Sequence, residues 1–330
     1  MQNPQIPNPK SQIPNPKSDL PALDCWFLTG PTAAGKTGVG VELARQIGAE
    51  IVSMDSMALY RGMDVGTAKP TAAERAAVPH HLIDLIEPHQ QYSLAQYLQA
   101  AHACIGQIKA RGREVLFVGG TPLYLKGLLR GIFDGPPADW EFRLRLRQEA
   151  RQQGSESLHR RLAEVDPAAA GRLHPHDTRR LIRALEVYEK TGRPISQWQR
   201  QFHVGRPAEA CRVFVLSWPR EVLHARIQRR VEQMFAAGLV EEVRGLLTRP
   251  LPLSRTARQA VGYREVIEHL RSRRPLAETV ELVKLHTRQL AKRQGTWFRG
   301  LSECRPLPIS ERMDAAEVAG RIAAAGGHRP

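Results

Sequence analysis

The sequence predicts an α/β fold in which helices cover both faces of a parallel sheet and a purely helical domain is inserted. Three observations lead to this fold. A glycine-rich pattern typical of a phosphate-binding loop (P-loop) follows a short apolar run and precedes a helical pattern. Further apolar runs alternate with helical stretches, as expected where both faces of a parallel sheet are buried. The segment from about 136 to 207 lacks strand signals and is rich in charged helical patterns.

The 330-residue chain begins with a proline-rich repeat, in which residues 5–11 (Gln-Ile-Pro-Asn-Pro-Lys-Ser) recur as residues 12–18. Proline at this density cannot join a helix or a central strand. We therefore expect a disordered tail over 1–21.

Four buried strands are expected where short apolar runs alternate with helical stretches. They cover residues 25–28, 50–54, 114–118 and 212–217. A helix capped by Ser93 should extend to about residue 111, and a basic helix should span about 275–298. Ligands of such sheets bind beyond the carboxyl ends of the strands. The P-loop, Asp55-Ser56 and Gly119-Gly120-Thr121 should therefore face one crevice.

The helical insertion contains two helices that begin at aspartates and carry many arginines. Asp139 can cap the first, and Asp177 can cap the second, which should end at Gly192-Arg193-Pro194. The predicted domains are an α/β core with C-terminal helices at 22–138 and 208–310, the insertion at 139–207 and a flexible tail at 311–330. Within that tail we expect one short helix.

The composition narrows the function. The formal net charge is +15 and the pI is about 10.2. A partner with many phosphates explains this charge, and the alternative is arginine spread over solvated faces. The four cysteines are far apart and form no C-x-x-C pair, so neither a zinc knuckle nor a disulfide framework is indicated. The pairs His80-His81 and His174/His176 are expected in loops and at helix ends rather than on a metal. No apolar run could span a membrane or act as a secretory signal, so we expect a cytoplasmic protein.

The P-loop pattern G-x-x-x-x-G-K-[ST] is met without a mismatch by residues 30–37. Its backbone N–H groups can surround a phosphate, Lys36 adds a positive charge and the Thr37 hydroxyl can hold Mg²⁺. The loop therefore predicts binding of a di- or triphosphate. Its candidate ligands are Gly30, Thr32, Ala33, Ala34, Gly35, Lys36 and Thr37.

Two polar residues at the other strand ends are candidates for chemistry. Asp55 could help to hold a metal, act as a general base or cap a turn. Thr121 follows two glycines, which let the backbone approach a ligand, although a turn role is equally compatible. Lys69 is interpreted as a loop cation.

Several motifs together resemble the tRNA dimethylallyltransferase family, also called tRNA isopentenyltransferases. They are the P-loop, residues 55–70 (DSMALYRGMDVGTAKP), 79–82 (PHHL), Gly119-Gly120-Thr121, 180–187, 261–264 (VGYR) and 287–294 (TRQLAKRQ). The resemblance covers about residues 24 to 300. No eukaryotic-type C-terminal zinc finger is visible, so the chain is similar to the bacterial members.

The resemblance implies a group transfer. Members move a dimethylallyl group from its diphosphate to N6 of the adenosine at position 37, next to the tRNA anticodon. The P-loop and Mg²⁺ would then hold the leaving diphosphate, together with Arg226. Asp55 matches the family's catalytic base, and Thr121 would bind near the reacting centre.

The resemblance also implies a tRNA-binding surface, with the target base drawn out of its stack. It would consist of Asp55, Ser56, Met57, Ala58, Thr121, Arg143, Arg179, Arg180, Arg183, Arg258, Gly262, Tyr263 and Arg264. Two positions depart from the family: Ala58 replaces a common Gln, and Pro122 replaces a common Gly. We expect partners to be tRNA and dimethylallyl diphosphate, with no membrane, and the chain to be a monomer.

Two other functions share the same loop and sheet. One is a nucleotide or small-molecule kinase that uses ATP, and the other is an RNA-binding ATPase that uses nucleotide as a switch. The basic insertion and the 55–70 motif argue against the kinase. No second acidic metal motif follows an apolar strand, which argues against the ATPase.

Overall fold

The computed structural model describes residues 21–132, 135–198, 205–272, 274–310 and 313–327. These residues form two compact units. The helical unit lies between Arg130 and Val204, and the core unit comprises the described parts of Asp19–Leu129 and Gly205–Pro330. The predicted disordered tail at 1–21 lies almost entirely outside the described residues. None of the described helices is long and apolar enough to cross a membrane.

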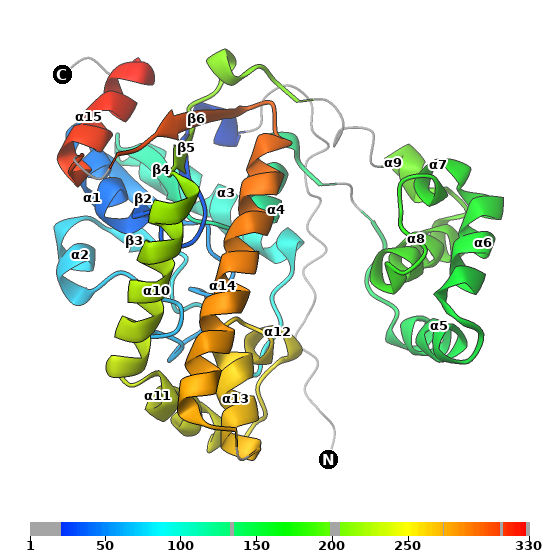
Figure 1. The fold of residues 1–330 in the computed structure, drawn as a ribbon. Coiled ribbons are helices and arrows are strands. Elements are labelled where there is room, and N and C mark those ends of the chain that lie inside the picture. The colour runs from blue at the N-terminus through cyan, green and yellow to red at the C-terminus, as the bar shows by residue number, and fades with distance from the viewer. Residues whose placement is uncertain (1–20, 133–134, 199–204, 273, 311–312, 328–330) are drawn as a thin grey trace. The chain divides into compact units, whose positions relative to one another are not determined.

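The core unit is built on one six-stranded parallel sheet, with strand order β3-β2-β4-β1-β5-β6 (Figure 1). The strands are β1 (Trp26–Thr29), β2 (Ala49–Ser53), β3 (His80–His81), β4 (Glu114–Val118), β5 (Val213–Ser217) and β6 (Cys304–Pro308). The central strand β1 pairs Trp26 with Leu116 of β4 and Phe27 with Val213 of β5. The predicted α/β class and all four predicted strands are confirmed.

Both edge strands escaped prediction. His80 and His81, expected in a loop, form β3. Its His81 Nε2 lies 2.6 Å from the Glu50 carboxylate, and His80 Nδ1 lies 2.7 Å from the Val78 carbonyl oxygen. The other edge, β6, contains Pro306 and Pro308, which an edge strand tolerates because one side of its ladder needs no N–H donors.

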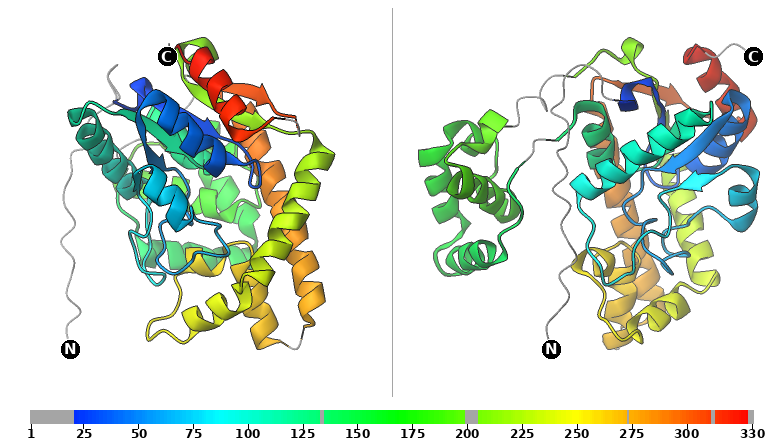
Figure 2. Two further views of the ribbon diagram at one scale, coloured as in Figure 1. Left: turned by 90° about the vertical axis from the view of Figure 1, so that its left-hand side faces the viewer. Right: turned by 180° about the vertical axis from the view of Figure 1, so that it is seen from behind.

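The first helix of the core, α1 (Lys36–Ile47), packs on one face of the sheet together with the last, α15 (Ala315–Ala325) (Figure 2). Asp314 caps α15, which buries Val318, Ala319 and Ile322 in the same apolar cluster. The short helix expected in the 311–330 segment is therefore present. The prediction of a flexible tail is wrong for these residues, because their apolar face belongs to the core.

Other helices cover the opposite face and extend beyond the sheet. α3 (Leu94–Ala110), capped by Ser93 as predicted, contacts β2 and β4, and its Tyr97 hydroxyl donates to the Ser53 carbonyl oxygen. α4 (Pro122–Arg130) follows β4, whereas the short α2 (Ala72–Ala77), which follows β2, contacts α1 on the first face. Two long helices, α10 (Arg220–Ala236) and α14 (Leu276–Arg299), run side by side (Figure 1). Between them come α11 (Leu239–Leu247), α12 (Arg255–Arg258) and α13 (Tyr263–Arg271).

The helical unit has its own apolar core, which includes Phe142, Leu158 and Leu181. Its helices are α5 (Trp140–Gln153), α6 (Ser155–Val165), α7 (Pro167–Ala170), α8 (Thr178–Thr191) and α9 (Ile195–Trp198). Asp139 caps α5 and Asp177 caps α8, and α8 ends at Gly192 in a left-handed conformation, all as predicted. The predicted insertion at 139–207 begins inside this unit and ends just beyond it.

Candidate active site

The predicted crevice exists as a pocket of about 490 Å³ in the core unit. All three predicted strand ends contribute to its lining. From the P-loop and α1 come Thr32, Ala33, Gly35, Lys36 and Thr37; from the strand ends come Asp55, Ser56, Met57, Ala58, Gly119, Gly120 and Thr121. Helices α10, α13 and α14 add Arg230, Tyr263, Leu290, Arg293 and Gln294. Residues from positions 32 to 294 thus meet at the carboxyl edge of the sheet.

The P-loop is held in shape from outside the pocket. Gly35 has φ 89°, a left-handed conformation that glycine adopts without strain. The Trp218 Nε1–H donates to the Ala34 carbonyl oxygen, and the Arg226 Nε–H donates to that of Ala33, each at 2.9 Å. The loop therefore keeps a preformed curve at the amino end of α1, where N–H groups and the helix dipole favour an anion.

Lys36 is poised for a negative ligand. Its Nζ donates to the carbonyl oxygens of Gly30 (3.0 Å) and Pro31 (2.8 Å). Desolvation and, to a smaller extent, the charge of Arg230 lower the pKa of Lys36 to about 8, although the charge of Asp55 acts in the opposite direction. Burial likewise lowers the pKa of the Arg230 guanidinium. Two cations held close together in a desolvated pocket favour binding of a multiply charged anion.

Arg230 is a cation of the pocket that the sequence prediction did not name. The predicted arginine, Arg226, does not line the pocket: it lies under the loop, with its guanidinium 4.5 Å from the Trp218 ring centroid. Arg230, one helical turn further along α10, does line it. The i, i+4 spacing from Arg226 was the signal available in the sequence. Arg226 thus supports the loop, and Arg230 supplies the second positive charge.

Asp55 and Thr121 face the pocket from neighbouring strands. The Met57 N–H donates to Asp55 Oδ1 (2.8 Å), so one carboxylate oxygen does cap a turn. Thr121 Oγ1 accepts from the Ser56 N–H (3.0 Å), and the Thr121 N–H donates to the Met54 carbonyl oxygen (3.2 Å). These bonds fix the Asp55 backbone against the end of β4. Gly119 is required there, because a Cβ would lie 2.1 Å from the Met54 carbonyl oxygen.

The predicted RNA contacts in the core unit divide into surface and interior positions. Arg258 and Arg264 are exposed, whereas Ala58, Gly262 and Tyr263 are buried. The Tyr263 hydroxyl donates to Glu242 Oε1 (2.6 Å), and Glu242 also accepts the N–H groups of Asp64 and Val65. Burial and the Glu242 charge raise the pKa of Tyr263. Tyr263 therefore forms part of the pocket wall. Lys69, bonded to Asp64, Asp84 and the Tyr60 carbonyl oxygen, is a structural loop cation as interpreted.

The predicted RNA contacts in the helical unit divide in the same way. Arg143 forms two 2.7 Å hydrogen bonds to Glu186, and Arg183 forms a third to the same carboxylate. Burial alone would raise the pKa of Glu186, but these hydrogen bonds lower it below its ordinary value. Arg179 and Arg180 are instead exposed. Arg143 thus holds α5 to α8, Arg183 supports the same carboxylate from within α8, and the side chains of Arg179 and Arg180 remain exposed.

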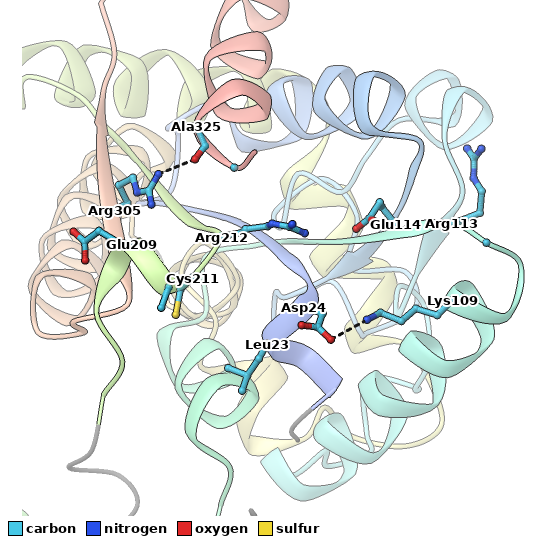
Figure 3. Close-up of a pocket in the computed structure, with 13 residues that line it drawn as sticks. Leu23, Asp24, Lys109, Arg113, Glu114, Glu209, Cys211, Arg212, Arg305 and Ala325 are labelled. Carbon is cyan, nitrogen blue, oxygen red and sulfur yellow. Dashed lines mark hydrogen bonds and ion pairs between the residues drawn. The ribbon is translucent and has the colours of Figure 1, made fainter. Parts of the chain in front are cut away.

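A second cavity, of about 720 Å³, lies at the amino edge of the sheet (Figure 3). Its lining mixes both charges: Asp24 lies 3.6 Å from the Lys109 ammonium, and Arg305 donates to the Ala325 carbonyl oxygen. Arg212 lies over the Trp26 ring. None of the predicted site residues lines this cavity, so the candidate site is the pocket at the opposite edge.

Two family models match the chain. "IPP transferase" matches residues 58–301, and "Isopentenyl transferase" matches residues 23–88. A tRNA dimethylallyltransferase from Rhodopirellula baltica is 49% identical, over 89% of this chain and 91% of its own length. The chain belongs to the tRNA dimethylallyltransferase family. The resemblance drawn from the motifs is thereby confirmed, and with it the prediction of a group-transfer enzyme rather than a kinase or an ATPase switch.

Solved structures agree with this family assignment. A tRNA isopentenylpyrophosphate transferase from Bacillus halodurans is 36% identical and superposes with a TM-score of 0.66, covering 92% of this chain and 96% of that chain. A eukaryotic dimethylallyltransferase acting on tRNA is 24% identical, with a TM-score of 0.74 over 91% of this chain and 77% of its own. That second likeness shows the fold alone.

Proposed function

We propose that the chain transfers the dimethylallyl group of dimethylallyl diphosphate to N6 of adenosine 37, on the 3′ side of the tRNA anticodon. The observation that carries the proposal is a single pocket that joins a cationic P-loop to a carboxylate. Lys36 and Arg230 supply charge for a diphosphate, and Asp55 faces the same space. The names of the relatives point to the same donor and acceptor.

The diphosphate is the leaving group of this reaction. The loop N–H groups, the α1 dipole, Lys36 and Arg230 all stabilise the negative charge that develops as the C–O bond breaks. Arg226 acts indirectly, because its bond to the Ala33 carbonyl oxygen keeps the loop curved. Thr32 lines the diphosphate site, but its N–H already donates to Gln294 Oε1 and is therefore not a donor to the diphosphate.

Magnesium fits this pocket as a partner of the diphosphate. Thr37 lines the pocket, and its hydroxyl makes no hydrogen bond to any of the described residues. In the described part of the chain, no three His, Cys, Asp or Glu side chains gather as a metal site. Mg²⁺ commonly takes one protein oxygen, phosphate oxygens and water. When bound, it would neutralise charge on the departing diphosphate, with Thr37 as its protein ligand.

Asp55 is placed to accept the proton of the acceptor amine. The N6 lone pair is delocalised into the adenine ring, which makes the amine a poor nucleophile. As N6 bonds to C1 of the dimethylallyl group, the C1–O bond breaks and diphosphate departs with the electron pair. The N6 proton passes to an Asp55 carboxylate oxygen. Oδ1 is oriented by the Met57 N–H, and Thr121 positions the neighbouring backbone through Ser56.

The tRNA is bound mainly by its phosphates. Exposed arginines occur on both units, Arg179 and Arg180 on the helical unit and Arg258 and Arg264 on the core unit. Each phosphate contact releases counterions, so binding should weaken steeply as salt increases. The net charge of +15 is consistent with such a polyanionic partner.

A transfer assay tests the proposal. The protein is incubated with unmodified tRNA, Mg²⁺ and either dimethylallyl diphosphate or ATP, and the nucleosides are analysed by mass. We expect a prenyl-sized gain on one adenosine from dimethylallyl diphosphate alone. An unchanged adenosine accompanied by ATP consumption would overturn the proposal.

A further inference from the structure

We propose that Gln294 is a positioning residue that sets the distance between the donor diphosphate and the base Asp55. This inference rests on the proposed function and concerns the same pocket. Gln294 is one turn from the carboxyl end of α14, far in sequence from both segments that it joins. Its side-chain amide bridges the P-loop and the turn that follows β4.

The two ends of the amide have different partners. The Thr32 N–H of the P-loop donates to Gln294 Oε1 (2.9 Å), across 262 residues of sequence. Gln294 Nε2 donates to the Gly120 carbonyl oxygen (2.7 Å), across 174 residues. One group must accept and the other donate, so among side chains of this length only an amide satisfies both. Glutamate lacks the donor, and methionine lacks the donor and a strong acceptor.

From the donating end of the amide, Nε2, the bridge continues through Gly120 to Asp55. Gly120 is followed by Thr121, whose Oγ1 accepts the N–H of Ser56, the residue after Asp55. The P-loop, Gln294, the Gly120-Thr121 turn and Asp55 are therefore joined by successive hydrogen and covalent bonds. The loop holds the leaving group and Asp55 receives the proton, so this linkage spans the two ends of the reacting system.

The glycine at position 120 is explained by the same contact. Its φ does not lie in the left-handed region, so its backbone does not require glycine. A Cβ there would lie 2.7 Å from Gln294 Nε2 but 3.4 Å from both the Gly30 carbonyl oxygen and Lys36 Nζ. The Gln294 amide is thus the main obstacle to a side chain at 120. Gly120→Ala should therefore push the Gln294 amide away from residue 120 and break the bridge.

Loss of the bridge should affect the transfer step more than the binding of either substrate. The loop remains held by Trp218 and Arg226, and Lys36 keeps its position, so diphosphate binding should change little. What changes is the alignment of the donor carbon with the amine beside Asp55. A misplacement of about 1 Å can reduce a rate about 100-fold.

The test compares Gln294→Met with Gln289→Ala, an exposed glutamine on the same helix. For each variant we would measure kcat for prenyl transfer, the Kd for inorganic diphosphate with Mg²⁺, the Kd for tRNA and the melting temperature. We expect Gln294→Met to lower kcat about 10- to 100-fold while both Kd values stay within about threefold. Gln289→Ala should match the wild type. Wild-type kcat in Gln294→Met, or an equal loss in diphosphate affinity, would overturn the assignment.

A double-mutant cycle tests the contact even if single variants are less stable. Gly120→Ala should lower kcat in the wild-type background but have little effect in a Gln294→Ala background, because the obstructing amide is gone. Additive losses would rule out the bridge. If the wild type itself transfers no prenyl group, the proposed function fails. The contact between Gln294 and Gly120 can still be tested in that case, because the melting temperatures of the four proteins should show the same non-additivity.

Discussion

Arg143 and Glu186 form a two-pronged ion pair that joins α5 to α8 inside the helical unit. Both hydrogen bonds are 2.7 Å long, and Glu186 has no exposed surface. The motif comparison marks Arg143 as an RNA contact, but only 21% of its side chain is exposed. Its main interaction is therefore internal, and any effect on RNA would be exerted through the fold of the unit.

Replacing Arg143 should consequently destabilise the helical unit. In Arg143→Ala the buried Glu186 keeps its hydrogen bonds from Arg183 and the Asp139 N–H but loses two, and we expect the free energy of unfolding to fall by about 1–3 kcal/mol. Thermal unfolding and tRNA binding across a salt series would be measured together. The matched control is Arg179→Ala, exposed on α8, which should leave the melting temperature unchanged and make the salt dependence shallower. If instead Arg143→Ala leaves the melting temperature unchanged and makes the salt dependence shallower, Arg143 is the direct RNA contact.

Asp55→Asn should nearly abolish transfer without loss of binding. The amide keeps the shape of the side chain but cannot accept the N6 proton, so kcat should fall about 10²- to 10⁴-fold. The Kd values for tRNA and inorganic diphosphate should change little. Asp24→Asn, 82% exposed beside the second cavity, is the control and should be fully active. A rate near that of the wild type would remove Asp55 as the base.

Diphosphate binding should depend on pH through Lys36. Its pKa of about 8 in the free protein lies below the ordinary lysine value, so the cation is lost as the pH rises through 8. A bound anion favours the charged form, so binding near pH 8 should take up a proton and weaken at higher pH. Calorimetry in two buffers of different ionisation enthalpy measures this uptake. Lys36→Met should bind diphosphate more weakly and lose the part of the proton uptake that is due to the lysine. If the proton uptake of Lys36→Met is unchanged, the titrating group is not Lys36.

Tyr263→Phe should reduce stability more than RNA binding. The hydroxyl is buried and donates to Glu242, which also holds the backbone of residues 64 and 65. Its removal leaves one oxygen of Glu242 without this donor, at a cost of about 1–2 kcal/mol. Chemical denaturation measures the loss. Arg258→Ala, an exposed arginine that the resemblance also predicts to contact RNA, should weaken tRNA binding instead, and equal stability of the two variants would contradict this division.

The core strands and the position of the pocket could be predicted from the sequence because both follow from local patterns. Apolar runs identify β1, β2, β4 and β5, and parallel pairing brings their carboxyl ends together. The edge strands could not be predicted in this way, since β3 has two residues and β6 carries two prolines.

The site residues that escaped prediction depend on contacts between distant segments. Gln294 acquires its role only when α14 reaches the P-loop, 262 residues away in sequence. Arg230 and Arg226 have the same residue type and lie one turn apart, and only the packing of α10 decides which of them faces the pocket. Likewise, Arg143 and the exposed Arg179 are indistinguishable until Glu186 is placed.

The packing of α15 on α1 has a consequence for biosynthesis. α1 carries the P-loop at its amino end and is among the first helices to leave the ribosome, but its apolar partner, including Val318 and Ile322, is among the last. The central strand β1 likewise pairs with β5, which is synthesised almost two hundred residues later. Pairing across such long separations slows folding. The nascent chain must therefore carry an incomplete phosphate site through nearly all of translation, and termination before residue 315 would leave α1 uncovered.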